Sequence, residues 1–358
     1  MSKEFNSNRF KVARLRRGLT IKALGEKIDR TSRTISSYEN DKEVPPESVI
    51  LKASKVLNYP VNFFYAEELD ELDTNSVSFR SLSKMTVAQK NIAISAGQIS
   101  VEFSHWLETK LNLPVIQVPE YRDLSPAAAA YAIRQEWQLG ELSISNMIHL
   151  LESKGIRVFS LLHNSKNIDA FSFWKDNVPF VFLNHQKSGE RSRFDAAHEL
   201  GHLIMHKHAK PQGREAETQA DSFASALLMP EGSVRGKAVY MPTLDTMIKL
   251  KSNWKVSVSA LVRRMKDLDL ITDWYYQKMN IQMSQRKMLQ KEPFGIEHEK
   301  SLLLEKTFKL LWSQGISREK ISELLLIPTS DLDNLVFGLS RSTKPETIIN
   351  TPNLSIVK

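Results

Sequence analysis

The residues with the clearest chemical potential are His198, Glu199 and His202, which form the pattern H-E-x-x-H. Two histidines four positions apart on a helix lie on one face, so both imidazoles can reach a single ion. Zinc accepts imidazole nitrogens, and a catalytic zinc site keeps one position for water. Glu199 is placed to take a proton from that water. The motif therefore predicts a catalytic zinc site with His198 and His202 as ligands and Glu199 as general base and acid.

A third ligand has two candidates further along the chain. Glu217 and Asp221 are four positions apart, so on a helix their carboxylates point to one side. Glu217 would complete a site of two His and one Glu, and Asp221 would accept a hydrogen bond from the far nitrogen of a liganding histidine. The alternative is His208, but the pattern H-E-x-x-H-x-x-G-x-x-H needs Gly where this chain has Met205. We favour Glu217.

His206 continues the same helix face one turn beyond His202. It could support a liganding histidine or contact a substrate. It could equally be a solvated histidine near the end of the helix, where the helix dipole favours its positive form. The spacing alone does not separate these interpretations.

Composition narrows the possible chemistry. The 358 residues include no cysteine, so a metal site must use His, Asp and Glu, and a thiol nucleophile is excluded. The length predicts two domains or three small ones, and 41% hydrophobic with 25% charged residues is ordinary for a globular chain. No apolar run of about 18 residues occurs, and the first residues lack the apolar core of a secretory signal. We therefore expect a cytoplasmic protein with no membrane segment.

Positive charge is concentrated at the N-terminus. Residues 1–60 hold 13 Lys and Arg against 7 Asp and Glu, whereas the net charge of the whole chain is +8. A basic module followed by a nearly balanced body favours nucleic acid as a partner. A merely solvated basic surface is the competing interpretation.

Periodicity and turn residues predict the elements that hold these groups. We expect short helices over 7–65, an acidic linker, and helices over 86–112, from Ser125-Pro126 onward and over 145–154. Three β-like runs follow, and helices resume at Phe194. The β-like runs cover 156–161, 170–174 and 179–183.

Within 20–40 the spacing is that of a helix-turn-helix, whose last helix enters the DNA major groove. We expect Ile35 and Tyr38 in the core and Gly25 where the two helices approach closely. The residues that would meet base edges are polar: Arg33, Thr34, Ser36 and Ser37. The cations that could meet phosphates are Arg14, Arg16, Arg17, Lys22 and Lys27.

This segment resembles the XRE (Cro-like) repressor family. The resemblance rests on Leu15 to Thr20, Leu24-Gly25 and Thr34 to Asn40, and it covers about 60 residues. It departs from the family at Ile21, where a polar residue is usual, and at Gly25, where alanine is usual. The resemblance implies a five-helix domain like that of lambda repressor, binding a double-stranded DNA operator.

Much of residues 75–290 resembles the ImmA/IrrE family of metallopeptidases. The matching words are Phe79-Arg80, Glu152 to Val158, Phe171 to Trp174, Phe182 to Asn184, Arg193 to His206, Glu217 to Ala220, Phe223-Ala224 and Leu227 to Pro230. The resemblance implies a zincin-like, gluzincin-type domain with Zn²⁺ and a small antiparallel sheet beside the metal helix. Family members relieve repression by cutting XRE-type repressors. An extended substrate could add to an exposed strand edge, either 170–174 or 179–183.

We therefore expect a mainly α fold with a small α+β part. The predicted divisions are a helix-turn-helix domain (1–66), a linker (67–85), a zinc metallopeptidase domain (86–270), a C-terminal helical region (271–338) and a loose tail (339–358). The leading hypothesis is a DNA-binding transcriptional regulator whose peptidase cuts a repressor-like protein or itself, and which forms a homodimer on paired half-sites. The alternatives are a non-enzymatic regulator that uses the peptidase fold as a sensor, or the effector of a toxin–antitoxin or mobile-element switch.

Three further features have a structural interpretation as well as a functional one. The pair of helices over 244–266 is basic and could contact nucleic acid, although a solvated face is favoured. The pair over 317–335 is acidic, which favours packing, dimerisation or sensing. Tyr240, Tyr275 and Tyr276 have the right chemistry to stabilise an oxyanion, but packing roles are favoured.

Overall fold

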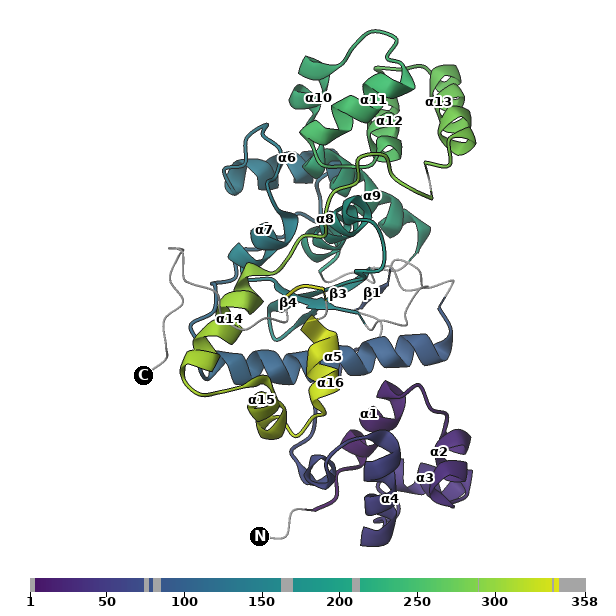
Figure 1. Ribbon diagram of the computed structural model, residues 1–358, viewed down its shortest axis with the longest axis vertical. Helices are drawn as coiled ribbons and strands as arrows, with labels where there is room; N and C mark the ends of the chain where they lie inside the picture. The colour runs from purple at the N-terminus through teal and green to yellow at the C-terminus, as the bar shows by residue number, and fades with distance from the viewer. Residues whose placement is uncertain are drawn as a thin grey trace.

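The computed structural model describes residues 4–73, 77–79, 85–161, 170–207, 213–288, 290–336 and 338–340. The chain is mainly helical with one small sheet, as predicted (Figure 1). The rival ligand His208 and all of the expected tail after Ser340 lie outside the described residues. None of the helices in the described ranges is long and apolar enough to cross a membrane.

The N-terminal helices form a separate bundle at one end of the molecule (Figure 1). Thr20 and Thr31 cap the second and third helices through their hydroxyls, and Ile35 and Tyr38 are buried as predicted. A Cβ on Gly25 would lie 2.5 Å from the Arg30 carbonyl oxygen, so this turn requires glycine. The expected fifth helix is a 3₁₀ helix, η1. The bounds are α1 Ser7–Arg16, α2 Ile21–Ile28, α3 Ser32–Glu39, α4 Glu47–Leu57 and η1 Val61–Tyr65.

Within the described residues four strands form one sheet in the order β1-β3-β4-β2. Their bounds are β1 Ser78–Phe79, β2 Arg157–Ser160, β3 Ala170–Lys175 and β4 Val178–Leu183. A two-residue turn at Asp176-Asn177, both with positive φ, makes β3 and β4 antiparallel. The expectation of an antiparallel sheet is wrong for β2, which pairs parallel to β4. The longer connection between β2 and β3 allows this arrangement.

The sheet lies between two helical layers. The long helix α5 (Val87–Glu108) covers one face, where Phe103 packs against Phe159 of β2, and α8 (Gly189–Met205) packs against β3 and β4. Figure 1 shows α5 below the strands and α8 above them. Phe171 and Phe182 stack across β3 and β4 with their ring centroids 4.3 Å apart. The helices beside α8 are α6 Pro126–Glu136, α7 Met147–Ser153 and α9 Arg214–Leu228.

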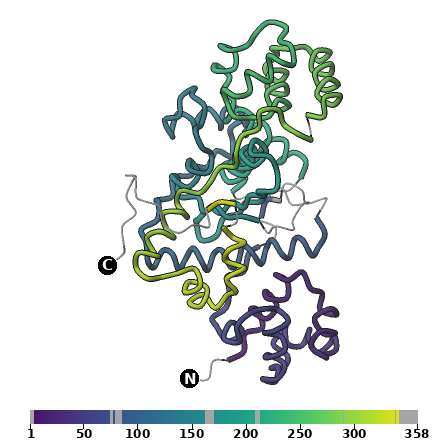
Figure 2. Tube along the Cα trace, in the orientation of Figure 1, coloured from purple at the N-terminus to yellow at the C-terminus, as the bar shows by residue number. Residues whose placement is uncertain are grey.

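The remaining helices form a lobe beyond α9 and then return to the sheet. The lobe contains α10 Glu231–Lys237, α11 Leu244–Leu250, η3 Lys251–Asn253, α12 Val258–Asp267 and α13 Asp273–Gln285. The returning helices are α14 Leu302–Ser313, α15 Arg318–Leu324 and α16 Thr329–Val336. Figure 2 shows the yellow-green chain returning to the level of the sheet, where α16 packs against β2 and Phe308 of α14 stacks against Phe103 of α5. The acidic pair α15–α16 therefore has the expected packing role.

The basic pair α11–α12 uses several of its cations inside the protein. Lys251 is buried between Glu190 and Glu292, at 3.0 and 3.1 Å from their carboxylate oxygens. Arg264 donates to the carbonyl of Met229, and Lys255 donates to that of Ser145. These contacts favour the packing interpretation of the pair over a second nucleic-acid site.

Candidate metal centre and nucleic-acid interface

Two helices packed against each other hold the predicted metal-binding residues. α8 begins at the Ser188 cap and presents His198 and His202 on one face, and α9 runs beside it with Glu217 and Asp221. A Cβ added at Gly201 would lie 3.0 Å from Phe223 Cδ1, so this glycine lets α9 come close to α8. The close packing of these helices brings the carboxylates to the histidines.

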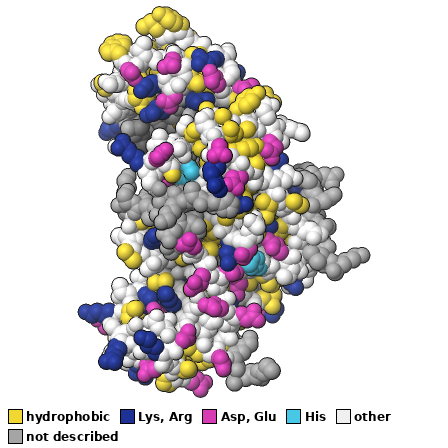
Figure 3. All heavy atoms as spheres, turned by 180° about the vertical axis from the view of Figure 1, so that it is seen from behind, with side chains coloured by type: hydrophobic (Ala, Val, Ile, Leu, Met, Phe, Trp, Pro, Cys, Tyr) yellow, Lys and Arg dark blue, Asp and Glu magenta, His cyan; other side chains and the backbone are white. Residues whose placement is uncertain are grey.

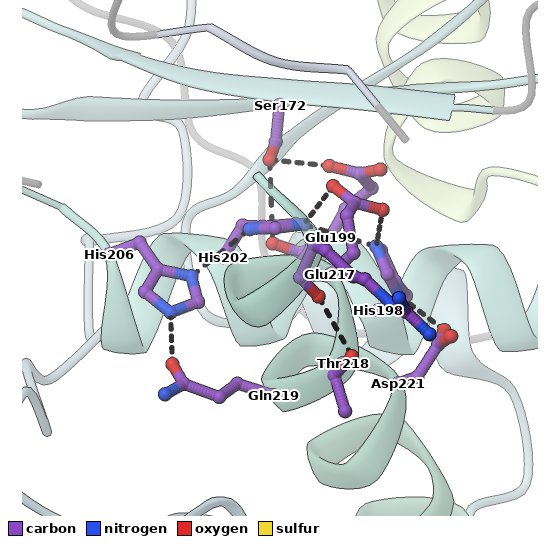
Figure 4. A network of polar contacts seen from close by, with 10 residues as sticks. Ser172, His198, Glu199, His202, His206, Glu217, Thr218, Gln219 and Asp221 are labelled. Carbon is purple, nitrogen blue, oxygen red and sulfur yellow. Dashed lines mark hydrogen bonds and ion pairs between the residues drawn. The ribbon is translucent and has the colours of Figure 1, made fainter. Parts of the chain in front are cut away.

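Three donor atoms converge between the two helices (Figure 4). The Nε2 atoms of His198 and His202 are 3.1 Å apart, and the Glu217 carboxylate oxygens lie 3.5 Å from the first and 3.4 Å from the second. A tetrahedral ion with bonds of about 2.0–2.1 Å places neighbouring donors roughly 3.3–3.4 Å apart. The three residues form a group that could hold a metal ion.

The protonation states of the two histidines also suit the binding of a cation. The Asp221 carboxylate accepts a hydrogen bond at 2.8 Å from His198 Nδ1, which leaves the Nε2 lone pair free of a proton in the neutral imidazole. Burial lowers the pKa of His202 to about 4, so it too is neutral at pH 7. Burial opposes ionisation of Glu217, but its close contacts with the two imidazoles outweigh this and lower its pKa to about 2. Two lone pairs and a carboxylate therefore face one another.

His206 supports His202 from behind. Its Nε2 donates to Gln219 Oε1 at 2.8 Å, so its Nδ1 is the acceptor for the Nδ1 of His202, 3.1 Å away. This chain of two hydrogen bonds keeps the proton of His202 on Nδ1 and its Nε2 directed at Glu217. His206 is buried, and the structure favours the supporting role over that of a solvated histidine. Gln219 was not anticipated from the sequence, although its position two residues after Glu217 places it on the same helix.

Glu199 is fully buried on α8 and is held by the sheet. The Ser172 hydroxyl on β3 donates to Glu199 Oε2 at 2.6 Å, and Figure 4 shows this side chain pointing from the strand towards the helix. Sequence reasoning did not identify Ser172. The available signal was a single hydroxyl between Phe171 and Phe173 in the predicted run 170–174, which is otherwise apolar.

The tyrosines considered as oxyanion stabilisers do not join this group. Tyr240 is 90% exposed in the segment between α10 and α11. Tyr275 donates to the carbonyl of Pro242 at 2.8 Å, and Lys266 lies over the ring of Tyr276. Packing and surface roles account for all three.

On the N-terminal bundle, the face of α3 that would meet DNA is accessible. Arg33 is exposed, and Thr34, Ser36 and Ser37 are half-buried on α3. Lys22 and Lys27 are also exposed, and Figure 3 shows Lys and Arg side chains over this part of the surface. These residues remain available for contacts with bases and phosphates.

The expected phosphate contacts from α1 are wrong. Arg14 is buried and donates to both oxygens of Glu39, at 2.5 and 2.7 Å. Arg17 donates to both oxygens of Asp331 at 2.9 and 3.1 Å, and Arg16 Nε lies 3.5 Å from the same carboxylate. Arg14 therefore makes its contacts within the bundle, and Arg16 and Arg17 link the end of α1 to α16.

The geometry describes a helix-turn-helix module joined to a domain with a buried His-His-Glu group. Residues 10–64 match the helix-turn-helix family, and residues 151–266 match the peptidase M78 family, described as the IrrE N-terminal-like domain. A search of curated proteins finds no match to this chain. The chain thus combines a helix-turn-helix DNA-binding domain with an M78 peptidase-like domain, which confirms both resemblances.

Proposed function

We propose that this protein is a DNA-binding regulator whose M78-like domain is a zinc-dependent endopeptidase. Its substrate would be a repressor-like XRE-type protein or the chain itself. The observation that carries the proposal is the convergence of His198, His202 and Glu217 beside the buried Glu199. A site that only bound a structural ion would not need a further buried carboxylate held at that place.

Each residue of the group has a distinct role in this proposal. His198, His202 and Glu217 would hold the ion, and a bound zinc ion polarises a peptide carbonyl and makes a water more acidic. Glu199 takes the proton of the attacking water and delivers it to the departing amine. Ser172 fixes one Glu199 oxygen, so the carboxylate keeps its position while the proton moves. Asp221 and His206 orient the two imidazoles.

The DNA-binding part of the proposal rests on α3. Arg33, Thr34, Ser36 and Ser37 would meet base edges in the major groove, while Lys22 and Lys27 would contact phosphates. Modules of this class act on paired half-sites, so we propose a homodimer on the operator. A cytoplasmic location follows from this proposal.

The decisive experiment compares new protein N-termini in cells that express the wild type or Glu199→Gln, with zinc supplied and stress applied. Glutamine keeps the size and the Ser172 contact but cannot accept a proton. We expect cleavage products only with the wild type, together with equal metal content in the two purified proteins. Products that persist with Glu199→Gln would overturn its role as base. Absence of new N-termini with both proteins would favour the non-enzymatic regulator.

A further inference from the structure

One strand of the sheet comes from outside the matched peptidase-like domain. Residues 151–266 contain β2, β3 and β4, which would leave β3 as an edge strand. In the full chain, β1 fills that edge with an antiparallel pairing of Ser78 to Ser172 and Phe79 to Phe171. The expected substrate edges therefore need correction: β4 is interior, and β3 is already covered over these two residues.

The position of β1 brings it next to the catalytic candidates. Residues directly opposite each other in an antiparallel pair point to the same face of a sheet. Ser172 faces α8 and bonds Glu199, so Ser78 faces the same side. Val77 and Ser78 are each 1% exposed, and the Ser78 hydroxyl has no hydrogen-bond partner among the described residues. The segment Val77–Phe79 thus lies where an extended polypeptide would have to lie to place a backbone beside Glu199.

We infer that Val77–Phe79 is an internal, substrate-like strand that closes this edge until a polypeptide displaces it. The inference rests on the proposed function and names the regulation of that site. Edge strands bind extended peptides through backbone hydrogen bonds, and a tethered strand competes at a high effective concentration. Within the described residues β1 pairs with β3 at two positions, and its tether to the chain supports this pairing against a free peptide. A displacing polypeptide needs a small residue opposite Ser172.

The test measures strand exchange without relying on hydrolysis. The probe is a fluorescein-labelled peptide that copies residues 75–82, and every protein carries Glu199→Gln so that the probe stays intact. The released variant replaces Val77, Ser78 and Phe79 by glycine. The locked variant is S78C/S172C, whose disulfide is the only one possible because the chain has no cysteine. Opposed Cα atoms in such pairs are about 4.5–5.5 Å apart, within the range of a disulfide.

We expect the probe to bind the released variant at least tenfold more tightly than it binds the protein with residues 77–79 unaltered. Fluorescence anisotropy, with and without zinc, measures both affinities. The oxidised locked variant should not bind it, and reduction should restore binding. A control peptide with proline at the Ser78 position should fail throughout. The control protein E68G/E71G, altered at two exposed residues of the same connection, should behave as the unreleased chain.

The inference is overturned if a folded released variant binds the probe no better than the protein with residues 77–79 unaltered does. It is also overturned if oxidation of the locked variant leaves probe binding unchanged. Its failure can be told apart from failure of the proposed function. Tight binding by the released variant with no cleavage by any protein that retains Glu199 would reject the peptidase and keep the strand exchange. Cleavage at equal rates in released and unaltered chains that both retain Glu199 and Ser172 would reject the strand exchange and keep the peptidase.

Discussion

The helix pairs α8–α9 and α2–α3 both place functional side chains at helical spacing, but they hold them in opposite ways. Between α8 and α9 the polar atoms point inward, and Asp221 and His206 each fix one imidazole. On α3 the predicted DNA contacts point outward, and Arg33 extends into solvent. A metal centre needs its donors oriented before the ion binds, whereas DNA supplies the partner atoms that order a surface side chain.

This difference predicts where substitutions will be costly. A change inside α8–α9 removes a partner from groups that are already buried, so one loss disturbs several contacts. A change on α3 would remove a contact made only in the complex with DNA, so the stability of the free protein should not change.

The largest effect is expected for His198→Ala. It removes one of three converging donors and leaves Asp221 without its histidine. Loss of a residue behind a ligand typically costs 10–100-fold in metal affinity, so loss of a ligand itself should cost about 10³-fold or more. Competition with a zinc-binding dye and metal analysis of the purified protein measure this. Full zinc content in His198→Ala would contradict the assignment, and Arg33→Ala is the matched surface control.

The convergence of His198, His202 and Glu217 could be predicted because its geometry is local. His198 and His202 share one helix turn, and Glu217 and Asp221 share another, so only the packing of α8 on α9 had to be assumed. The three main strands were likewise recognisable from short apolar runs between turn residues. Side-chain periodicity of two and of 3.6 residues carries this information within each element.

Contacts between distant elements could not be predicted in the same way. Ser172 reaches Glu199 only because of how β3 lies on α8, and the sequence analysis did not predict the strand β1. The arginines of α1 looked like phosphate contacts because charge alone does not reveal which side of a helix faces the protein. Asp331, which binds Arg17, lies 314 positions away in the chain.

Removal of Asp331 should give the next largest effect. Its carboxylate is buried between Arg16 and Arg17, and loss of one partner from such a buried group costs about 3–5 kcal/mol. We expect Asp331→Asn to lower the free energy of unfolding by roughly 3 kcal/mol at pH 7, as measured by urea denaturation. Asp333→Ala on the same helix breaks only a partly exposed pair with Arg318, so it should cost at most about 1 kcal/mol.

The pH dependence of this difference provides a second check. Burial opposes ionisation of Asp331, but the charges of Arg16 and Arg17 outweigh it, so the pKa of Asp331 is lowered in the folded protein. A lowered pKa means that the stabilisation is complete above the pKa of the unfolded chain and is lost as pH falls through the folded value. The stability gap between wild type and Asp331→Asn should therefore shrink below about pH 4. A gap that does not change with pH would rule out the ion pair as its cause.

A smaller effect is expected for His206→Ala. The imidazole of His206 orients His202 but contacts neither Glu217 nor His198 in the described network. Its loss should weaken zinc binding by about 10–100-fold, and Gln219→Ala should weaken it less, because it acts one hydrogen bond further away. The same dye competition measures both. Thr218→Ala, which removes only a bond to the Arg214 carbonyl on α9, is the matched control.

The smallest effect on the free protein is expected for Arg33→Ala, which tests the other side of the comparison. Arg33 is exposed, so its loss should leave the free energy of unfolding and the zinc content unchanged. If it meets a base, affinity for the DNA selected by the wild type from a random pool should fall by about 1–3 kcal/mol, and sequence preference should relax at one position. Lys22→Ala should instead weaken binding to all sequences and reduce the salt dependence. Equal behaviour of the two variants would mean that Arg33 contacts only phosphate.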